Sequence, residues 1–256
     1  MLSKNKIKFI KALQSKKNRE NTGLFVAEGN KIVSELISSS LKINFIAATD
    51  QWFEQNVHLK IHNNIEKVIA DKSELLQASL LKSPQNALCV VEIPQYILNI
   101  HELSNKLSII LDRVQDPGNL GTIIRIADWF GIENIICSKD SADNFNPKVV
   151  QSTMGAIARV KIHYMDLINL FTEVGINDIL IFGTTLQGES IYNCVLPPNG
   201  FILLGNESKG INPDFQPYLS KQLFIPYFPD GQKRSESLNV AIAAAIVCSE
   251  FRRRTR

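Results

Sequence analysis

The chain has 256 residues, 45% of them hydrophobic, and 28 Lys and Arg against 25 Asp and Glu, which gives a formal net charge of +3. This length allows about two domains, and the apolar content allows a sizeable globular core. No membrane span is expected, because the best apolar run, residues 241–248, is far shorter than the ~20 residues that a membrane helix needs.

The positions of cysteine and histidine argue against metal and disulfide chemistry. The four cysteines lack paired spacing, which speaks against a zinc site or a disulfide framework and fits a reducing cytosol. His58 and His62 could share one helix face, but no third ligand is nearby, so no metal is expected. The start of the chain lacks an apolar signal region, and the expected location is cytoplasmic.

Residues 1–94 are predicted to form a small α/β domain. Apolar residues at three-residue steps predict a helix over residues 7–13. Asp71 and Glu74 have the spacing of a capping box, which predicts that a helix starts there. The other predicted elements are a helix over residues 31–37 and strands over residues 24–27, 43–48, 68–70 and 87–93. This alternation is typical of an α/β unit.

The excess of positive charge lies in the first part of the chain. Residues 1–105 hold 13 Lys and Arg and 10 Asp and Glu, whereas residues 106–256 hold 15 of each. Most of the excess comes from seven early residues: Lys4, Lys6, Lys8, Lys11, Lys16, Lys17 and Arg19. They are interpreted either as a basic arm that faces phosphate or as a solvated helix face.

Residues 95–106 are predicted to be a linker, although their apolar residues suggest that it also packs against another part of the protein. Residues 107–256 form the second predicted domain, which opens with a continuous apolar run typical of a strand buried on both faces. Helices are predicted over residues 120–130, 147–159, 167–174 and 238–252, and further strands over 132–137, 179–183, 201–204 and 223–226. This order predicts a mainly parallel sheet covered by helices, with ligands at the carboxyl ends of the strands.

Three polar segments fall at those carboxyl ends. The first runs from Asp116 through Asn119 to Arg125; Asn119 is predicted to cap the following helix, and the alternative is a capped helix with one surface arginine. The second, residues 205–210, contains Gly205 and Glu207, and taken alone it is better explained as a turn with an exposed acid.

The third segment opens the last predicted helix. Ser237 is the predicted N-cap, which places Asn239 in the first turn, an unfavourable position unless the side chain has a task. The alanines that follow, between residues 241 and 245, allow close packing against either a core sheet or a partner protomer. The sequence has no G-x-G-x-x-G, Walker or G-x-S-x-G motif, which disfavours a Rossmann enzyme, a P-loop protein and an α/β-hydrolase.

In this order and with these residues, the three segments resemble the motifs of the SpoU (TrmH-like) RNA ribose 2′-O-methyltransferases of the SPOUT superfamily. The resemblance covers about residues 107–252. It implies a parallel-sheet α/β domain with a trefoil knot, a homodimer, and S-adenosyl-L-methionine as cofactor. The basic start and residues 25–29 resemble the small L30e-like domain that binds the RNA substrate in ribosomal-RNA members.

The resemblance also assigns residues. Its active-site positions correspond to Asn119, Arg125, Glu207, Ser237 and Asn239. Its cofactor-binding positions correspond to Gly205, Ile225 and Leu238, with Thr184 lining the same pocket. Arg125 would act either as a base or as a phosphate clamp, and no metal is implied. One departure is the stretch 227–236, which is longer than usual and carries Lys233 and Arg234.

The reaction expected from this resemblance is methylation of a ribose 2′-hydroxyl, most readily in ribosomal RNA. Alternatives are a transfer-RNA ribose methyltransferase, a base methyltransferase on the same fold, a small-molecule α/β enzyme, and a non-catalytic RNA-binding or ribosome-assembly protein. Residue types alone do not identify the RNA or the nucleotide, nor a link to antibiotic resistance.

Overall fold

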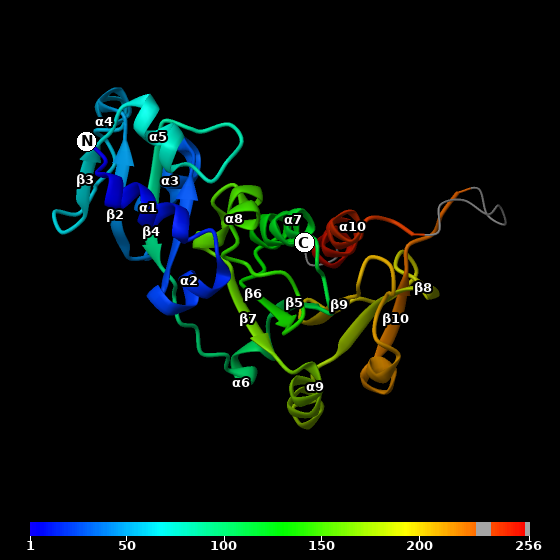
Figure 1. Ribbon diagram of the computed structural model, residues 1–256. Coiled ribbons are helices and arrows are strands. Elements are labelled where there is room, and N and C mark those ends of the chain that lie inside the picture. Colours follow the sequence, from blue (N-terminus) through cyan, green and yellow to red (C-terminus); the bar gives the residue numbers. More distant parts are fainter. Residues whose placement is uncertain (229–236, 254–256) are drawn as a thin grey trace. The chain divides into compact units, whose positions relative to one another are not determined.

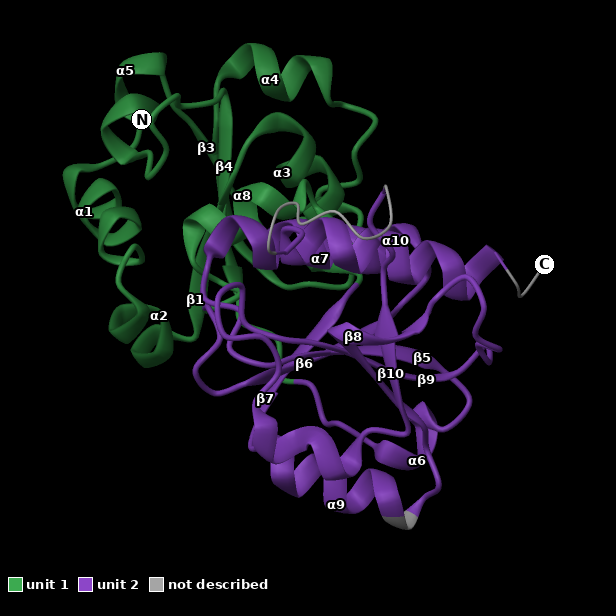
Figure 2. Ribbon diagram, turned by 90° about the vertical axis from the view of Figure 1, so that its right-hand side faces the viewer, with its two compact units in different colours: residues 1–95, 143–159 green, residues 96–142, 160–256 purple. Residues whose placement is uncertain are grey.

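The computed structural model describes residues 1–228 and 237–253 (Figure 1). By contact, the chain divides into two compact units: unit 1 holds residues 1–95 and 143–159, and unit 2 holds residues 96–142 and 160–256 (Figure 2). Both units alternate helices and strands, so the predicted α/β class is confirmed. Among the described helices, none has the length and apolar character to cross a membrane.

Unit 1 is built on a four-stranded mixed sheet in the order β1-β4-β2-β3. Strand β4 runs antiparallel to both of its neighbours, whereas β2 and β3 are parallel. The strands are β1 (Leu24–Glu28), β2 (Ile43–Ala48), β3 (Glu66–Ile69) and β4 (Ala87–Glu92). The helices are α1 (Lys4–Ala12), α2 (Lys16–Thr22), α3 (Asn30–Ile37), α4 (Asp50–Gln55), α5 (Lys72–Ala78), α8 (Pro147–Thr153) and the 3₁₀ turn η1 (Ala156–Ala158).

Local sequence signals explain several of these elements. The capping box before α5 is confirmed: Glu74 N donates to Asp71 Oδ1 at 2.8 Å, and Asp71 N donates to Glu74 Oε2 at 3.0 Å. Helix α3 buries one apolar face. Helix α4 was not predicted, although Thr49 caps it by accepting from Trp52 N.

Arg19 is not part of an exposed basic arm. Its side chain is 3% exposed, donates to the carbonyls of Leu13 and Gln14, and forms an ion pair with Asp143. A buried arginine needs such partners because desolvation of an unpaired charge is costly. Lys6 is also engaged, since its ammonium pairs with Glu66. The exposed basic residues of α1 and α2 are therefore Lys4, Lys8, Lys11, Lys16 and Lys17.

Residues 143–159 belong to unit 1, although strands of unit 2 precede and follow them in the chain. The Phe145 ring lies 4.7 Å from that of Phe25 on β1, measured between centroids. Arg159 Nη1 donates to Glu35 Oε2 at 2.6 Å. The Asp143–Arg19 pair completes this packing. The predicted domain limits place these residues in the second domain, and the sequence contains no local signal of their long-range partners.

Glu28 is a buried carboxyl at the end of β1. It accepts from Leu80 N at 2.7 Å and from Ser79 Oγ, and burial raises the pKa of this carboxyl despite both hydrogen bonds. At a pH between the ordinary pKa of a glutamate and the raised pKa of Glu28, the Glu28 carboxyl is protonated more often in the folded state than in the unfolded state. The contribution of Glu28 to stability therefore falls as pH rises through that window.

We expect Glu28→Gln to become more stable relative to the wild type as pH rises from about 4 to about 7, because glutamine keeps an acceptor for Leu80 N and cannot ionise. Urea unfolding in a Trp129→Phe background, followed by the fluorescence of buried Trp52, measures this difference. The exposed Glu54→Gln is the control and should show no such trend. Parallel pH curves for Glu28→Gln and the wild type would contradict the expectation.

Unit 2 has a six-stranded, fully parallel sheet in the order β10-β8-β9-β5-β6-β7. The strands are β5 (Leu107–Leu111), β6 (Asn134–Ser138), β7 (Lys161–Met165), β8 (Ile181–Ser190), β9 (Gly200–Leu204) and β10 (Lys221–Phe224). The helices are α6 (Ile100–Leu103), α7 (Pro117–Trp129), α9 (Leu167–Ile176), α10 (Val240–Arg253) and the 3₁₀ helix η2 (Pro213–Tyr218). The central strands β5 and β9 are buried along their whole length, as expected for a sheet covered on both faces.

Helices cover both faces of this sheet. Helices α7 and α10 pack against each other on one side, and α6 and α9 lie on the other (Figure 2). Ile100 and Leu103 of the predicted linker are buried in the core cluster that contains Phe171 and Phe201. Residues 96–106 thus pack as part of unit 2, in line with their apolar content.

Candidate active site

The first polar segment lies between β5 and α7. Asp116, rather than Asn119, caps α7: its Oδ1 accepts from Asn119 N at 2.8 Å, and Pro117 takes the first helical position. The predicted N-cap was therefore wrong by three residues. The Asn119 side chain is left free to make other hydrogen bonds.

Those hydrogen bonds join the three polar segments. Asn119 Nδ2 donates to Glu207 Oε1 at 2.9 Å, and Asn239 Nδ2 donates to Asn119 Oδ1 at 2.9 Å. Glu207 and Asn239 lie 88 and 120 residues after Asn119 in the chain. The structure thus places three predicted site residues in one polar chain at the carboxyl end of the sheet.

Asn239, rather than Ser237, caps the last helix. Helix α10 begins at Val240, and Asn239 Oδ1 accepts from Ala241 N at 2.9 Å and Ile242 N at 3.3 Å. The amide therefore uses its oxygen for the helix and its nitrogen for Asn119. This double use explains an asparagine at this position, and it corrects the predicted placement in the first turn.

Arg125 and Ser237 are not part of this polar chain. Both are exposed, and Arg125 makes no hydrogen bond or ion pair with any residue in the described part of the chain. On α7 it lies on the same exposed face as Thr122 and Trp129. An exposed guanidinium on the helix that also carries Asn119 is suited to binding an anion from solution.

The predicted cofactor positions contribute main chain. Gly205 follows β9, Ile225 follows β10 and Leu238 precedes α10. Within residues 1–228 and 237–253, the main-chain groups of these three form no hydrogen bond. Thr184 differs, because its hydroxyl donates to Leu203 O at 3.1 Å. In the stretch 227–236, residues 229–236 lie outside the described residues, and Lys233 and Arg234 with them.

Sequence reasoning missed the residues that hold the second segment in place. Asn206 Nδ2 donates to Arg113 O at 2.8 Å, and Asn212 N donates to Asp112 Oδ2 at 2.7 Å. One signal was available: an acid placed directly after a strand of mostly apolar residues is unusual unless it has partners.

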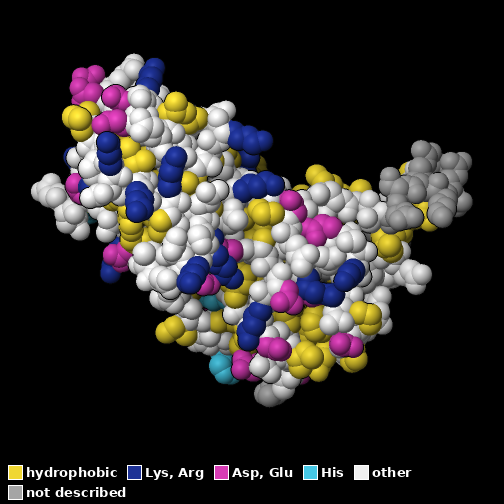
Figure 3. All heavy atoms as spheres, viewed as in Figure 1, with side chains coloured by type: hydrophobic (Ala, Val, Ile, Leu, Met, Phe, Trp, Pro, Cys, Tyr) yellow, Lys and Arg dark blue, Asp and Glu magenta, His cyan; other side chains and the backbone are white. Residues whose placement is uncertain are grey.

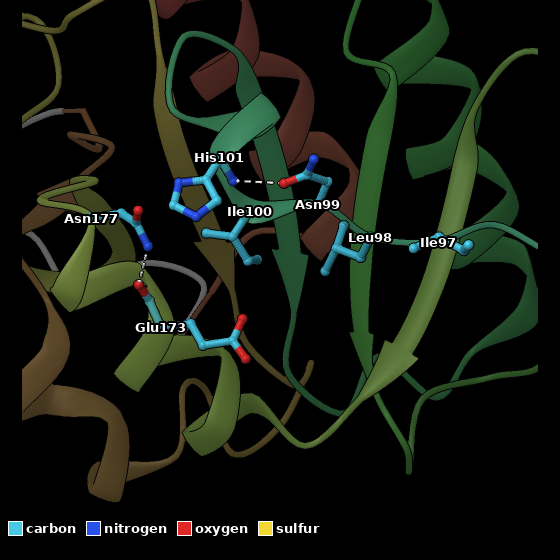
Figure 4. A pocket seen from close by; sticks show the side chains of 7 residues that line it. All are labelled: Ile97, Leu98, Asn99, Ile100, His101, Glu173 and Asn177. Carbon is cyan, nitrogen blue, oxygen red and sulfur yellow. Dashed lines mark hydrogen bonds between the residues drawn. The ribbon is translucent and has the colours of Figure 1, made fainter.

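One hollow in unit 2 lies away from this edge. It has a volume of about 510 Å³ and lies between α9 and the segment before α6 (Figure 4). Its polar groups are already paired in part, since His101 N donates to Asn99 Oδ1 and Asn177 Nδ2 donates to Glu173 O. None of the predicted site residues lines it, so its size does not make it the candidate site. Among the described residues, no three His, Cys, Asp or Glu side chains are grouped to hold a metal ion.

Comparison with known proteins agrees with the motif geometry. Residues 106–249 match the family model described as the SpoU rRNA Methylase family, and residues 4–89 match the MRM3-like substrate binding domain. The chain belongs to the SpoU rRNA methylase family. The network of Asn119, Glu207 and Asn239 therefore joins the three motifs of a SpoU domain.

Relatives match over nearly the full chain. The 23S rRNA (guanosine(2553)-2′-O)-methyltransferase RlmP of Bacillus subtilis is 29% identical over 248 residues, 96% of each chain. A TrmH-family protein of Porphyromonas gingivalis has a solved structure with a TM-score of 0.87, 35% identity and 99% coverage of both chains. An AdoMet-bound rRNA methyltransferase of Sinorhizobium meliloti has a TM-score of 0.85 and 27% identity, and it covers 100% of this chain and 97% of that one.

Proposed function

We propose that this SpoU-family protein transfers a methyl group from S-adenosyl-L-methionine to a ribose 2′-hydroxyl of ribosomal RNA. The observation that carries the proposal is the hydrogen-bonded chain from Glu207 through Asn119 to Asn239, which unites the three motifs at the edge where parallel sheets bind ligands. The names of relatives such as RlmP, a 23S rRNA 2′-O-methyltransferase, support ribosomal RNA over transfer RNA. We also propose that the enzyme is cytoplasmic, which agrees with the four buried, free cysteines.

The residues present fit the cofactor. S-adenosyl-L-methionine supplies an activated methyl group on a sulfonium sulfur. The main-chain groups of Gly205, Ile225 and Leu238 form no hydrogen bond within the described residues, and they offer donors and acceptors for an adenine ring and a ribose. We further propose that the fold of unit 2 contains the trefoil knot that the family resemblance implies.

The chain's own residues would align the acceptor ribose. In methyl transfer the 2′-oxygen forms a bond to carbon, the bond from carbon to sulfur breaks, and the hydroxyl proton leaves to solvent or a base. Asn119 is held on both sides, by Glu207 and Asn239, so its amide has a fixed direction toward a bound ribose. Fixing both reactants in a near-attack geometry lowers the barrier by roughly 7–11 kcal/mol.

Arg125 is proposed to clamp the phosphate next to the target ribose. An arginine stays charged in water, and its planar fork matches two phosphate oxygens. The exposure of Arg125 and its lack of an acid partner among the described residues support this role over that of a base. Ser237, exposed beside Asn239, is proposed to contact the same RNA backbone.

Unit 1 is proposed to bind the RNA. The exposed lysines of α1 and α2 carry positive charge on one surface, and dark-blue side chains gather there in Figure 3. Lys16 has only a weak partner, Glu20 at 3.8 Å. Phosphate neutralisation by such residues makes affinity fall with salt concentration.

The protein is also proposed to form a homodimer through α7 and α10. Trp129 is 84% exposed and Ile242 is 52% exposed, on two helices that pack side by side. We expect Trp129→Glu to convert the dimer into a monomer, because a buried unpaired carboxylate at an interface is costly. Analytical ultracentrifugation measures this, with Ile97→Glu on the α6 side of the sheet as the control that should stay dimeric. A monomeric wild type would contradict the proposal.

The test of function is a methyl-transfer assay. Purified protein and labelled S-adenosyl-L-methionine are incubated with ribosomal or transfer RNA from a strain that lacks the gene, and the nucleosides are analysed by mass spectrometry. A 2′-O-methylated nucleoside in ribosomal RNA is the expected product. The same product in transfer RNA alone would change the substrate class, and absence of both cofactor binding and transfer would favour a non-catalytic RNA-binding protein.

A further inference from the structure

Asp112 and Arg113 form a buried ion pair directly after β5. Asp112 is 1% exposed, and the Arg113 side chain is 28% exposed. Arg113 Nε donates to Asp112 Oδ1 and its Nη2 donates to Oδ2, both at 2.9 Å. This hydrogen-bonded pairing raises the pKa of the Arg113 guanidinium. Two adjacent residues thus form a bidentate ion pair at the carboxyl end of the central strand β5.

The pair holds both ends of the loop that carries Glu207. At the start of the loop, Asn206 Nδ2 donates to Arg113 O at 2.8 Å. At its end, Asn212 N donates to Asp112 Oδ2 at 2.7 Å. The carboxylate of Asp112 therefore accepts three N–H groups, two from Arg113 and one from the loop, and this is what makes its burial tolerable.

Between these two anchors, the loop is held together by its own hydrogen bonds. Asn206 and Gly210 exchange two main-chain hydrogen bonds of 3.0 and 2.9 Å, and Asn206 Oδ1 accepts from Ser208 N and Lys209 N. Any shift of the anchors would therefore move the loop as one piece. Glu207 would move with it relative to Asn119, to which it is hydrogen bonded.

The main chain of Arg113 supports a positioning role. Its φ is +56°, in the left-handed region that few residues other than glycine adopt. The conformation is held by Arg113 N, which donates to Ser138 Oγ at 2.9 Å. It also directs the carbonyl of Arg113 to Asn206. Strain of this kind persists only where surrounding contacts determine it.

We propose that Asp112 and Arg113 are positioning residues for methyl transfer, which set the place of Glu207, and through it Asn119, without touching the substrate. The inference rests on the proposed function, because it assigns a task to Glu207 in that reaction. Two groups of residues at this edge then have different roles. Asp112 and Arg113 fix the loop, and the polar chain of Glu207, Asn119 and Asn239 contacts the ribose.

The test uses the full-length chain with Asp112→Asn, which keeps the size of the side chain and removes the charge. We expect kcat for RNA methylation to fall by about 10²-fold, as for a catalytic group displaced by about 1 Å, with little change in KM or cofactor affinity. Amide hydrogen exchange in residues 206–212 should become about tenfold faster or more. Asp140→Asn, an exposed acid at the same edge, is the control and should stay within about two- to threefold of the wild type.

A double-mutant cycle with Glu207→Gln tests whether Asp112 acts through Glu207. The two substitutions together should lower kcat little more than Glu207→Gln alone, because residues that act through one another are not additive. Additive losses, or a wild-type kcat in Asp112→Asn, would overturn the proposal. If Asp112→Asn does not fold, Arg113→Lys is used instead. It keeps the charge of a partly exposed side chain but loses the two-pronged hydrogen bonding to Asp112, and the same changes in kcat and hydrogen exchange are expected.

The exchange measurement separates the two proposals. If the wild type methylates no RNA, the proposed function fails, and unchanged exchange of residues 206–212 in the variants then overturns the anchoring by Asp112 and Arg113 as well. Faster exchange in the variants would support the anchoring even in that case.

Discussion

Replacing Arg125 with alanine is expected to lower kcat for RNA methylation by about 10²–10⁴-fold, the usual contribution of a group that assists proton transfer or aligns the reactants. Folding and cofactor affinity should be unchanged, because the side chain is exposed and has no partner among the described residues. Single-turnover transfer of labelled methyl groups to ribosomal RNA measures the loss, and calorimetry measures cofactor binding.

Arg125→Lys distinguishes the two roles of this residue. If Arg125 clamps a phosphate, lysine keeps the charge but loses the two-pronged contact, so activity falls partway and the pH profile stays as it was. If Arg125 is a base, lysine, with an ordinary pKa near 10.4, loses its proton at lower pH and shifts the profile in that direction. Thr122→Val, one turn earlier on the same face, should retain activity. Turnover like that of the wild type in Arg125→Ala would remove Arg125 from either role.

The carboxyl edge of the sheet could be predicted because its signals are local. A mostly apolar run, interrupted only by Ser108, predicted β5 over Leu107–Leu111 as observed, and polar segments after buried strands marked the edge. The meeting of Asn119, Glu207 and Asn239 follows from a general property of parallel sheets, whose strands all end at one side. The assignment of catalytic and cofactor roles to these residues stays a prediction.

The N-cap residues of α7 and α10 could not be assigned from the sequence, because each segment contains more than one residue that can act as an N-cap. Asp116 and Asn119 are both good N-caps, as are Ser237 and Asn239. The choice depends on partners far away in the chain: Asn119 is needed by Glu207, and Asn239 by Asn119. The capping propensity of a residue does not depend on hydrogen bonds to distant parts of the chain, and these two bonds join residues 88 and 120 positions apart.

Two other features were not predictable from pattern. Strand β7 is an edge strand with a mixed burial pattern, which leaves only a weak alternation over five residues. Helix α2 has no apolar stripe, because its buried residue is Arg19. A charged residue was reasonably assigned to a solvated face, since arginine is almost never buried unless paired, and its partner Asp143 lies 124 residues away.

Substitution of Asp143, the partner of Arg19, is expected to have the largest effect on stability. We expect Asp143→Asn to lower the free energy of unfolding of unit 1 by about 3–5 kcal/mol, because Arg19 would remain as a buried charge without a counter-charge. The asparagine can still accept from Phe145 N, as Asp143 Oδ1 does at 2.9 Å, so the local turn is kept and the change reports on the charge.

Urea unfolding in a Trp129→Phe background measures this effect, because the chain has two tryptophans and Trp52 then reports on unit 1 alone. Glu20→Gln is the matched control: it removes a carboxylate from the Lys16–Glu20 pair, in which both side chains are 63% exposed, and it should cost less than about 1 kcal/mol. If Asp143→Asn were as mild as this control, the Arg19 charge would have to be satisfied by the carbonyls of Leu13 and Gln14 alone. Residues 143–159 would then add to unit 1 mainly through the packing of Phe145 on Phe25.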